Sequence, residues 1–402
     1  MNGAAAVESA VGIEVYATRG ERCRGVAKSS AGDFRVEEMV TAGEMEKEPL
    51  PGYFPVYRVE KQGVDTMHMA EELSRELRSR VSYGGMKDSR ARSVQFVTPT
   101  SLRSARPDRV NGDRFTAELV GWAPKPLTRG SVVGNRFLVV LRECCETIGQ
   151  RVEESFDAAR RGKVPNYFGL QRFGVRGAGT HAVGKAMVAG DFEGAVRLIL
   201  GGSGGGALRL ARGQDVERAV AREAERHPGE WVRVLRAVPL GLRRLYVQAY
   251  QSFIFNRSLS LALRAGEDIS TYVKGDNWAT VSGGGLVTSH ARSAREVPTG
   301  TATPLIQLVG YAYRNYGSRF DGYVEEVLRA EGVSPGQFFL EGMQEASAEG
   351  GFRRPQIAVA EESWKLEGET AELAFALGRG QYATVLLREI LKPEDPLVSG
   401  LF

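Results

Sequence analysis

Cysteine and histidine are scarce in this chain of 402 residues, which has three cysteines and four histidines. The cysteines are Cys23, Cys144 and Cys145, and neither a Cys-x-x-Cys nor a His-x-x-x-His pair occurs. We therefore expect no zinc site. An odd cysteine count with one adjacent pair is not the pattern of a disulfide framework. The sequence thus predicts reduced cysteines and no bound metal.

Long apolar runs are missing as well. No stretch of 18 apolar residues occurs, so no membrane span is expected. The N-terminus lacks the basic start and apolar block of a secretion signal. The glycine-rich segment 201–206 has no following Gly-Lys-Ser/Thr and does not predict a Walker phosphate loop. These absences predict a cytoplasmic protein.

The charge of the chain is modest in sum but uneven in distribution. The formal net charge is +4, whereas residues 75–114 hold ten Lys or Arg and only four Asp or Glu. Such a concentration favours a polyanionic partner such as nucleic acid. A solvated surface with scattered acidic partners would give the same count, and charge alone does not decide between the two interpretations.

The length and hydrophobic fraction, 402 residues and 42%, suit a globular protein of two or three domains. The first 145 residues predict several strands and a helix after Asp65, without the regular alternation of a parallel α/β fold. Phe34, Val36 and Glu38 share one face of a strand at period two. The predicted strands of this part are 34–38, 54–59, 81–83, 112–120 and 135–142.

A mostly helical block follows, and strand patterns return near the end of the chain. The predicted helices are 152–161, 182–187, 192–200, 215–226, 242–265 and 323–330. The aromatic stripe of helix 242–265 is interpreted as core. Leu373, Phe375 and Leu377 then alternate as a strand before a glycine turn and a last helix. This order predicts a helical insertion into one discontinuous α+β domain.

The first part of the chain is organised around residues 84–95, Gly-Gly-Met-Lys-Asp-Ser-Arg-Ala-Arg-Ser-Val-Gln. The glycine pair predicts a sharp turn with positive φ after a strand. Lys87 and Asp88 follow directly. Taken alone, the stretch would be a charged surface turn, because isolated charge pairs are usually solvated.

Two further stretches change that interpretation. They are residues 165–174, Pro-Asn-Tyr-Phe-Gly-Leu-Gln-Arg-Phe-Gly, and 378–389, Gly-Arg-Gly-Gln-Tyr-Ala-Thr-Val-Leu-Leu-Arg-Glu. Together with residues 84–95 they resemble the signatures of the tRNA pseudouridine synthase D (TruD) family. The nine residues from Asn166 match the family pattern in full, while Ser93 stands where threonine is usual. The other matching positions are Lys28, Asp33, Phe34, Val36, Glu38, Gly85, Lys87, Asp88, Ala91 and Gln95.

The resemblance implies a fold and an activity. The fold would be α+β, a pseudouridine-synthase-like catalytic domain with a mixed, largely antiparallel sheet flanked by helices, interrupted by a mostly helical insertion. The predicted catalytic domain is 1–190 with 350–402, and the insertion is 191–349. The implied activity is isomerisation of uridine to pseudouridine in tRNA, usually at uridine 13.

The resemblance also implies roles for individual residues. Asp88 corresponds to the family's catalytic carboxylate, Phe168 and Tyr382 would flank the target base, and Phe34 and Asn166 stand at substrate-contacting positions. The isomerisation changes no oxidation state and imports no group, so we expect no cofactor. The nucleotide must turn out of the RNA to reach the acid, and aromatic rings suit a flipped base.

Basic residues complete the predicted site. Lys28, or the adjacent Lys87, would keep Asp88 ionised, and Lys28 is the preferred partner because neighbours in a strand point to opposite faces. Four arginines would contact RNA phosphates without reading sequence. They are Arg90, Arg92, Arg103 and Arg106. The expected partner is tRNA, with no membrane, metal or obligate protein partner.

Two alternatives remain open at this point. A catalytically silent RNA-binding protein on the same scaffold would keep the basic stretch without needing Asp88. A carboxylate glycosidase would usually need two opposed acids, and only Glu38 offers a remote second one. The role of Asp88, attack at the sugar or proton removal, is not decided by the sequence.

Overall fold

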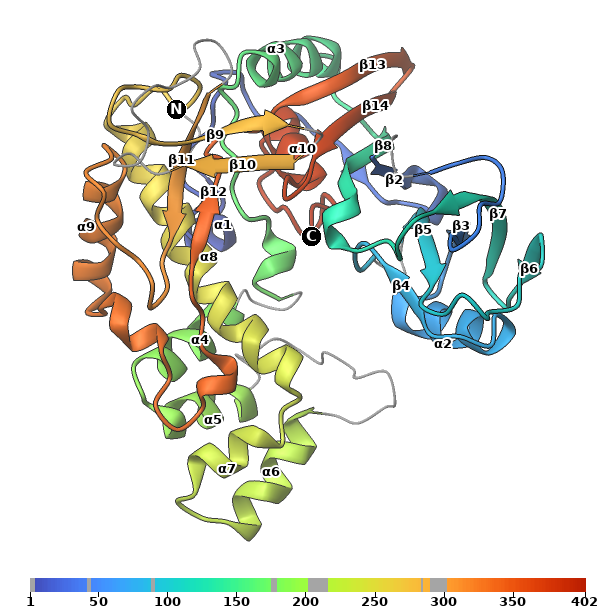
Figure 1. Ribbon diagram of the computed structural model, residues 1–402. Helices are drawn as coiled ribbons and strands as arrows, with labels where there is room; N and C mark the ends of the chain where they lie inside the picture. Colours follow the sequence, from blue (N-terminus) through green and yellow to red (C-terminus); the bar gives the residue numbers. More distant parts are fainter. Residues whose placement is uncertain are drawn as a thin grey trace.

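The computed structural model describes residues 4–41, 45–87, 91–174, 179–201, 216–282, 285–289 and 302–402. Figure 1 shows a region built on strands and a mostly helical region that meet in the middle of the molecule. The long helix α8 (Leu240–Arg264) runs through the helical region, and the C-terminus lies between the two regions.

One mixed sheet of ten strands, counted over the described residues, organises the first region. Its main order is β13-β14-β8-β2-β5-β3-β7-β6, with β1 paired to β8 and β4 to β5. Strands β2 and β5 are parallel, and the other pairs are antiparallel. The predicted α+β class with a largely antiparallel sheet is confirmed. The strands are β1 (Val26–Ala27), β2 (Phe34–Val40), β3 (Phe54–Lys61), β4 (Val81–Tyr83), β5 (Arg92–Pro99), β6 (Arg109–Asn111), β7 (Phe115–Ala123), β8 (Val132–Arg142), β13 (Val359–Glu367) and β14 (Thr370–Gly378).

Helices cover this sheet through aromatic and aliphatic side chains. Helix α3 (Ile148–Arg160) brings Phe156 onto Phe375 of β14, with ring centroids 6.1 Å apart. Phe375 in turn stacks on Phe137 of β8 at 5.4 Å. Helix α10 (Ala383–Leu391) packs against α3, and every residue of α10 is buried. The last 50 residues therefore complete the core of the domain that the first 145 residues begin.

Local sequence signals predicted several of these elements. Asp65 caps α2 (Thr66–Glu76), where its side chain accepts hydrogen bonds from the backbone amides of Met67 at 2.8 Å and His68 at 3.0 Å. Phe34 and Glu38 are buried on one face of β2, as the period of two predicted. Such signals work because they depend only on neighbouring residues.

The glycine pair at residues 84 and 85 acts differently from the prediction. Neither residue has a positive φ. A Cβ at Gly84 would lie 2.1 Å from Cγ2 of Val132, so glycine is needed there for a close approach between segments. The prediction of a positive-φ turn is wrong, because close packing against a distant strand leaves no local sequence signal.

The helical region is built around α8. Tyr246, Tyr250 and Ile254 of α8 are buried, which confirms that the aromatic stripe belongs to the core. No helix in the described part of the chain is both long and apolar enough to cross a membrane. The other helices of this region are α4 (Thr180–Val188), α5 (Phe192–Leu200), α6 (Val216–Arg226), α7 (Trp231–Arg236) and α9 (Asp321–Glu331).

A second sheet, of four strands within the described residues, was not predicted. Its order is β10-β9-β11-β12, and its strands are β9 (Asn277–Ser282), β10 (Gly285–Ser289), β11 (Thr303–Leu308) and β12 (Gly351–Arg353). Strand β11 is buried on both faces, so it shows no alternation of polar and apolar residues. Strand β12 lies just after the predicted end of the insertion, whose boundaries stay a prediction.

The N-terminal segment also has more structure than the sequence indicated. Helix α1 (Ala6–Ser9) is followed by Val11 and Ile13, which are fully buried. Glu8 forms a buried ion pair with Arg388 of α10, with 2.7 Å between Oε1 and Nε. The segment therefore packs into the main hydrophobic core, although a four-residue helix is too short for a periodic pattern.

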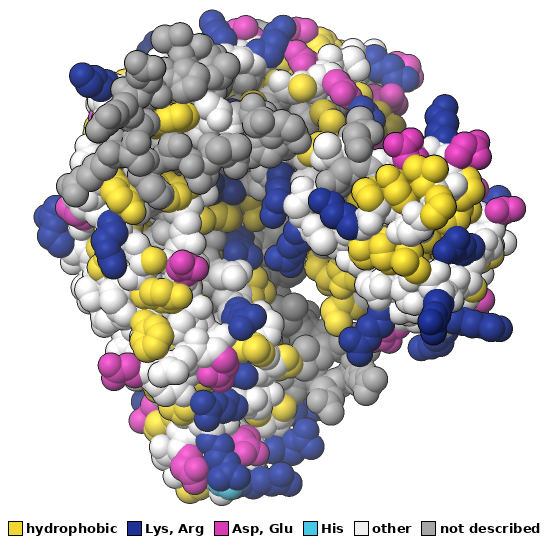
Figure 2. Space-filling view, viewed as in Figure 1, with side chains coloured by type: hydrophobic (Ala, Val, Ile, Leu, Met, Phe, Trp, Pro, Cys, Tyr) yellow, Lys and Arg dark blue, Asp and Glu magenta, His cyan; other side chains and the backbone are white. Residues whose placement is uncertain are grey.

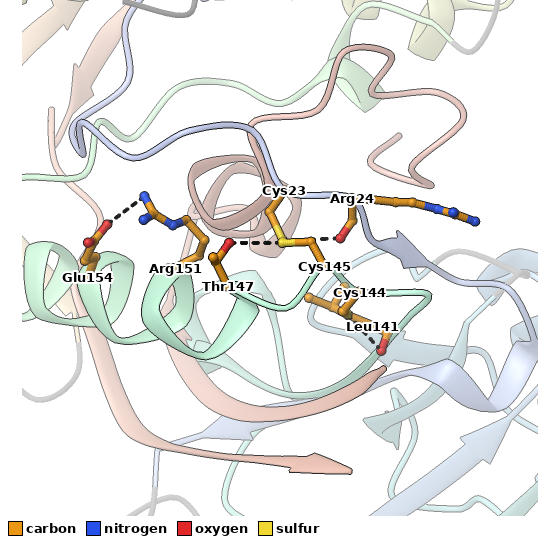
Figure 3. Close-up of a disulfide and its surroundings, with 8 residues drawn as sticks. All are labelled: Cys23, Arg24, Leu141, Cys144, Cys145, Thr147, Arg151 and Glu154. Carbon is orange, nitrogen blue, oxygen red and sulfur yellow. Dashed lines mark hydrogen bonds and ion pairs between the residues drawn. A yellow bond between two sulfur atoms is a disulfide. The ribbon is translucent and has the colours of Figure 1, made fainter. Parts of the chain in front are cut away.

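A disulfide joins Cys23 to Cys145 across 122 residues of sequence (Figure 3). Cys23 lies in the N-terminal segment, and Cys145 lies between β8 and α3. Cys144 is buried and free. The expectation of reduced cysteines is wrong for this pair, because the fold brings together two residues that the cysteine count alone could not pair.

We predict that the disulfide stabilises the native state. In the chain-entropy model, a cross-link that closes a loop of this length lowers the conformational entropy of the unfolded chain. The free energy of unfolding rises by about 4–5 kcal/mol as a result. Reductant should therefore lower the denaturant concentration at which half of the wild-type protein is unfolded. The same midpoint of the double variant Cys23→Ser/Cys145→Ser should not change with reductant. Thiol titration of the unreduced, denatured protein should find one thiol, and a count of three would contradict the pairing.

Candidate active site

A pocket of about 250 Å³ opens where the parallel strands β2 and β5 meet β8 and the start of α10. Its described lining comes from five separate stretches of the chain. The lining residues are Lys28, Phe34, Val36, Met86, Lys87, Ala91, Ser93, Asn135, Phe137, Gln171, Gln381, Tyr382, Ala383 and Thr384. The three motif blocks of the sequence thus converge on one cavity.

Four of the predicted site residues line this pocket directly: Phe34, Lys28, Lys87 and Tyr382. Asp88 and Arg90 lie outside the described residues. Lys87 and Ala91, the nearest described residues on either side of them, both line the pocket. None of the described lining residues is an Asp or Glu.

The backbone of Lys87 is held from both sides. Its amide donates to Oγ1 of Thr66 at 2.9 Å, and Nζ of Lys61 donates to its carbonyl oxygen at 3.2 Å. Thr66 also donates to Oε1 of Gln95 at 3.1 Å, so the motif residue Gln95 supports this arrangement from β5. The residue before Asp88 is therefore fixed by side chains of α2, β3 and β5.

The two predicted lysines have different partners. Nζ of Lys87 forms an ion pair with Glu38 at 3.1 Å and donates to Oδ1 of Asn135 at 2.5 Å. Nζ of Lys28 donates to the main-chain oxygen of Phe402 at 2.6 Å and lies 5.0 Å from the ring centroid of Phe34. Because Lys87 neutralises Glu38, that acid is poorly suited to serve as a second catalytic carboxylate.

Phe168 lies beside the pocket and contacts Tyr382, with ring centroids 6.2 Å apart and the planes inclined at 62°. Asn256 of α8 holds the backbone of Phe168. Its side chain accepts from the Phe168 amide at 2.8 Å and donates to the Phe168 and Val11 carbonyls at 3.1 Å each. Helix α8 thereby positions an aromatic ring beside the pocket.

Asn166 is buried, and its amide is already engaged. Its Nδ2 donates to the carbonyl of Arg354 at 3.0 Å, and its Oδ1 accepts from Nη2 of Arg353 at 2.8 Å. Both ends of the amide are used within the protein. The prediction that Asn166 contacts the substrate is not tested by these contacts, which show a structural role.

Arg353 was not singled out by the sequence, yet it connects the two aromatic segments. Its guanidinium donates to the carbonyls of Asn166 and Tyr167 on one segment and of Gly380 on the other, at 3.1, 3.2 and 2.7 Å. It lies 3.9 Å from the ring centroid of Phe168 and 5.8 Å from that of Tyr382. No ion-pair partner exists among the described residues.

The pKa of Arg353 is lowered to about 10, mainly because burial disfavours the charged guanidinium; Tyr382 opposes this lowering and the nearby charge of Arg172 adds to it. Burial also lowers the pKa of Arg172. The guanidinium of Arg353 remains protonated at neutral pH. A positive charge therefore lies beside the rings of Phe168 and Tyr382, and no Asp or Glu of the described residues pairs with it.

A direct hydrogen bond also links the second and third motif blocks. Nε2 of Gln171 donates to Oγ1 of Thr384 at 3.0 Å. A Cβ at Gly169 would lie 3.2 Å from that hydroxyl and 3.4 Å from Cδ1 of Tyr382, so glycine allows the two segments to approach closely. Gly380, with a φ of +81°, makes the turn before Tyr382.

Of the predicted phosphate-contacting arginines, the three that the structure describes are not gathered at the pocket. Arg92 forms an ion pair with Glu60. Arg92 and Ser93 are consecutive in β5 and face opposite sides of the sheet, and Ser93 lines the pocket. Arg103 and Arg106 are exposed in the loop after the far end of β5. Their contact with RNA stays a prediction.

Comparisons with known proteins agree with this arrangement. The family profile of tRNA pseudouridine synthase D (TruD) matches residues 10–212 and 205–390. Proteins named probable tRNA pseudouridine synthase D are similar over nearly their whole length: one from Pyrobaculum arsenaticum is 30% identical, with 98% of each chain covered, and one from Natronomonas pharaonis is 32% identical, with 98% of this chain and 99% of the other covered.

A crystal structure from Methanosarcina mazei, described as a TruD protein, matches with a TM-score of 0.75 and 26% identity, covering 97% of this chain and 98% of that one. The fold is therefore that of an RNA-modifying isomerase. The chain belongs to the tRNA pseudouridine synthase D (TruD) family.

We predict that Asn256→Ala destabilises the protein. The substitution leaves the amide and carbonyl of Phe168 and the carbonyl of Val11 without partners in a buried place, at a cost of about 1–3 kcal/mol. Denaturant unfolding measures the loss. Ser258→Ala is the matched control, because the buried Ser258 hydroxyl donates only within α8, to Ile254. Equal stability of the two variants would contradict the proposed anchoring of Phe168.

Proposed function

We propose that this protein isomerises uridine to pseudouridine in tRNA, with uridine 13 as the expected position and Asp88 as the catalytic residue. The main support is the convergence of motif residues on one pocket. Lys87 and Ala91, on either side of Asp88 in sequence, line the pocket together with Phe34 and Tyr382. The pocket has the scale of a single base, at about 250 Å³.

The reaction breaks the N1–C1′ glycosidic bond, turns the uracil and joins C5 to C1′. The C5 proton is lost and N1 gains a proton, so atoms and electrons balance without a co-reactant. On these grounds no cofactor is required. In the proposal the carboxylate of Asp88 stabilises the developing positive charge at the sugar, attacks C1′ or removes the C2′ proton.

The nucleotide enters the pocket by turning out of the RNA. Tyr382 and Phe34 both line the pocket and offer their rings to the base. Phe168, the other ring predicted to flank the base, is only 8% exposed and contacts the ring of Tyr382. Lys28, which lines the same pocket, is the proposed partner that keeps Asp88 ionised.

The domain division is part of the same proposal: residues 1–190 with 350–402 carry the chemistry, and 191–349 help to choose the RNA. Cytoplasmic location is also proposed, since tRNA is modified there. Disulfides are rare in reducing compartments, with hyperthermophile proteins as an exception. The Cys23–Cys145 bond is therefore unusual for a cytoplasmic protein.

We expect Asp88→Asn to abolish catalysis, because the amide is neutral and cannot replace the carboxylate. The measurement is tritium release from tRNA labelled at uracil C5, which should fall to the rate without enzyme. Asp108→Asn is the control, since Asp108 is exposed in the same basic part of the chain. Equal release by wild type and Asp88→Asn would remove Asp88 from the mechanism.

The same assay separates the alternatives. No release by the wild type on several tRNAs to which it binds would favour a silent RNA-binding protein. Free uracil in place of pseudouridine would indicate a glycosidase. Mapping pseudouridines in tRNA with and without the protein identifies the position modified.

A second prediction concerns the ring of Tyr382. Stacking of a base on an aromatic side chain contributes about 1–3 kcal/mol, so Tyr382→Leu should lower kcat/KM by roughly 5- to 150-fold. Tyr382→Phe keeps the ring, so its kcat/KM should stay within a few-fold of the wild-type value. A Phe variant as inactive as the Leu variant would assign the function to the hydroxyl and contradict stacking.

A further inference from the structure

Gln381 is a buried side chain in the pocket wall whose amide oxygen has no partner among the described residues. It is 9% exposed and lies in the turn between β14 and α10, directly before Tyr382. Its Oε1 is buried and accepts no hydrogen bond from the described residues. Gln381 nevertheless lines the pocket. A buried amide normally has partners, because an unsatisfied one costs about 1–3 kcal/mol.

Other buried amides near the site are satisfied by the protein itself. Both ends of Asn166 bind Arg353 and the carbonyl of Arg354. Asn256 uses its amide on the backbone of Phe168 and Val11. Gln171 is bonded to Thr384. Gln381 is therefore the described amide of the pocket whose acceptor is left for a ligand.

The ligand that fits is a flat base with adjacent donor and acceptor groups. Uracil presents an N3–H donor flanked by the O2 and O4 acceptors. An amide can accept from N3–H with its oxygen and donate to a neighbouring carbonyl with its nitrogen. A base stacked on Tyr382 would have an edge within reach of the preceding residue of the same turn.

We propose that Gln381 binds the edge of the uracil in the pocket. This inference rests on the proposed function. It assigns to Gln381 the binding of the N3–H and one carbonyl of the target uracil. The cost of the unsatisfied amide in the free protein is recovered when the base arrives, which favours uridine over bases with a different edge.

The test uses Gln381→Leu, which keeps the approximate volume and removes both polar groups. We expect kcat/KM to fall about 10- to 100-fold for tRNA, as for the loss of one or two buried hydrogen bonds. The midpoint of thermal unfolding should stay the same or rise, because an unsatisfied buried amide has been removed. A purely structural role would instead lower stability and activity together, and that result would overturn the proposal.

The control is Gln356→Leu. Gln356 is also buried with an unsatisfied Oε1, but its Nε2 donates to Thr303 and it does not line the pocket. This variant should change stability and leave kcat/KM for folded enzyme unchanged. An equal fall in kcat/KM for both variants would contradict a specific role of Gln381.

Equilibrium binding separates this inference from the proposed function. RNA with N3-methyluridine at the target position lacks the N3–H donor, and the wild type should bind it at least tenfold more weakly than the unmodified RNA. Gln381→Leu should lose most of that preference. If wild type binds the RNA but forms no pseudouridine, the proposed function fails while this preference still tests Gln381. A preference that is equal in both proteins, or absent in the wild type, overturns the inference.

Discussion

The guanidinium of Arg353 holds together the two chain segments on which the proposed site depends. It donates to carbonyl oxygens of Asn166, Tyr167 and Gly380 and lies over the ring of Phe168. These segments come from distant parts of the sequence, and one carries Phe168 while the other carries Tyr382. A planar group with five donors can make such a junction where a point charge such as lysine cannot.

Side chains from distant segments also hold Lys87, the residue before the proposed catalytic acid. Thr66 and Lys61 fix the amide and the carbonyl of Lys87, and Glu38 and Asn135 fix its ammonium group. Such supporting contacts matter because a catalytic group must be held within a fraction of an ångström of its productive position. Much of the motif that surrounds Asp88 therefore has a positioning role rather than a chemical one.

The end of the chain is bound to its beginning by buried polar groups. Arg388 of α10 pairs with Glu8 and lies 3.8 Å from the ring centroid of Tyr16. Glu389 accepts from the backbone amides of residues 17 and 18. The Arg-Glu pair of the last motif thus fastens the N-terminal segment, which the Cys23–Cys145 bond also ties to the start of α3. A motif that carries the family resemblance therefore need not take part in the reaction itself.

The sequence by itself determined the elements whose signals are local. These are the cap of α2 by Asp65, the alternating faces of β2 and β14, the helical periods, and the motif blocks that carry the family resemblance. These features depend on neighbours a few residues apart, and so they can be read without a fold. The four-stranded sheet was missed because β11 is buried on both faces and has no alternation.

Only the tertiary structure decided which distant residues meet. It turned Asn166 toward Arg353, left the Oε1 of Gln381 without a partner among the described residues, and paired Cys23 with Cys145. Each of these outcomes depends on the packing of segments far apart in the chain. Hydrogen bonds and steric approach between such segments are properties of the folded chain, and no spacing within one segment encodes them.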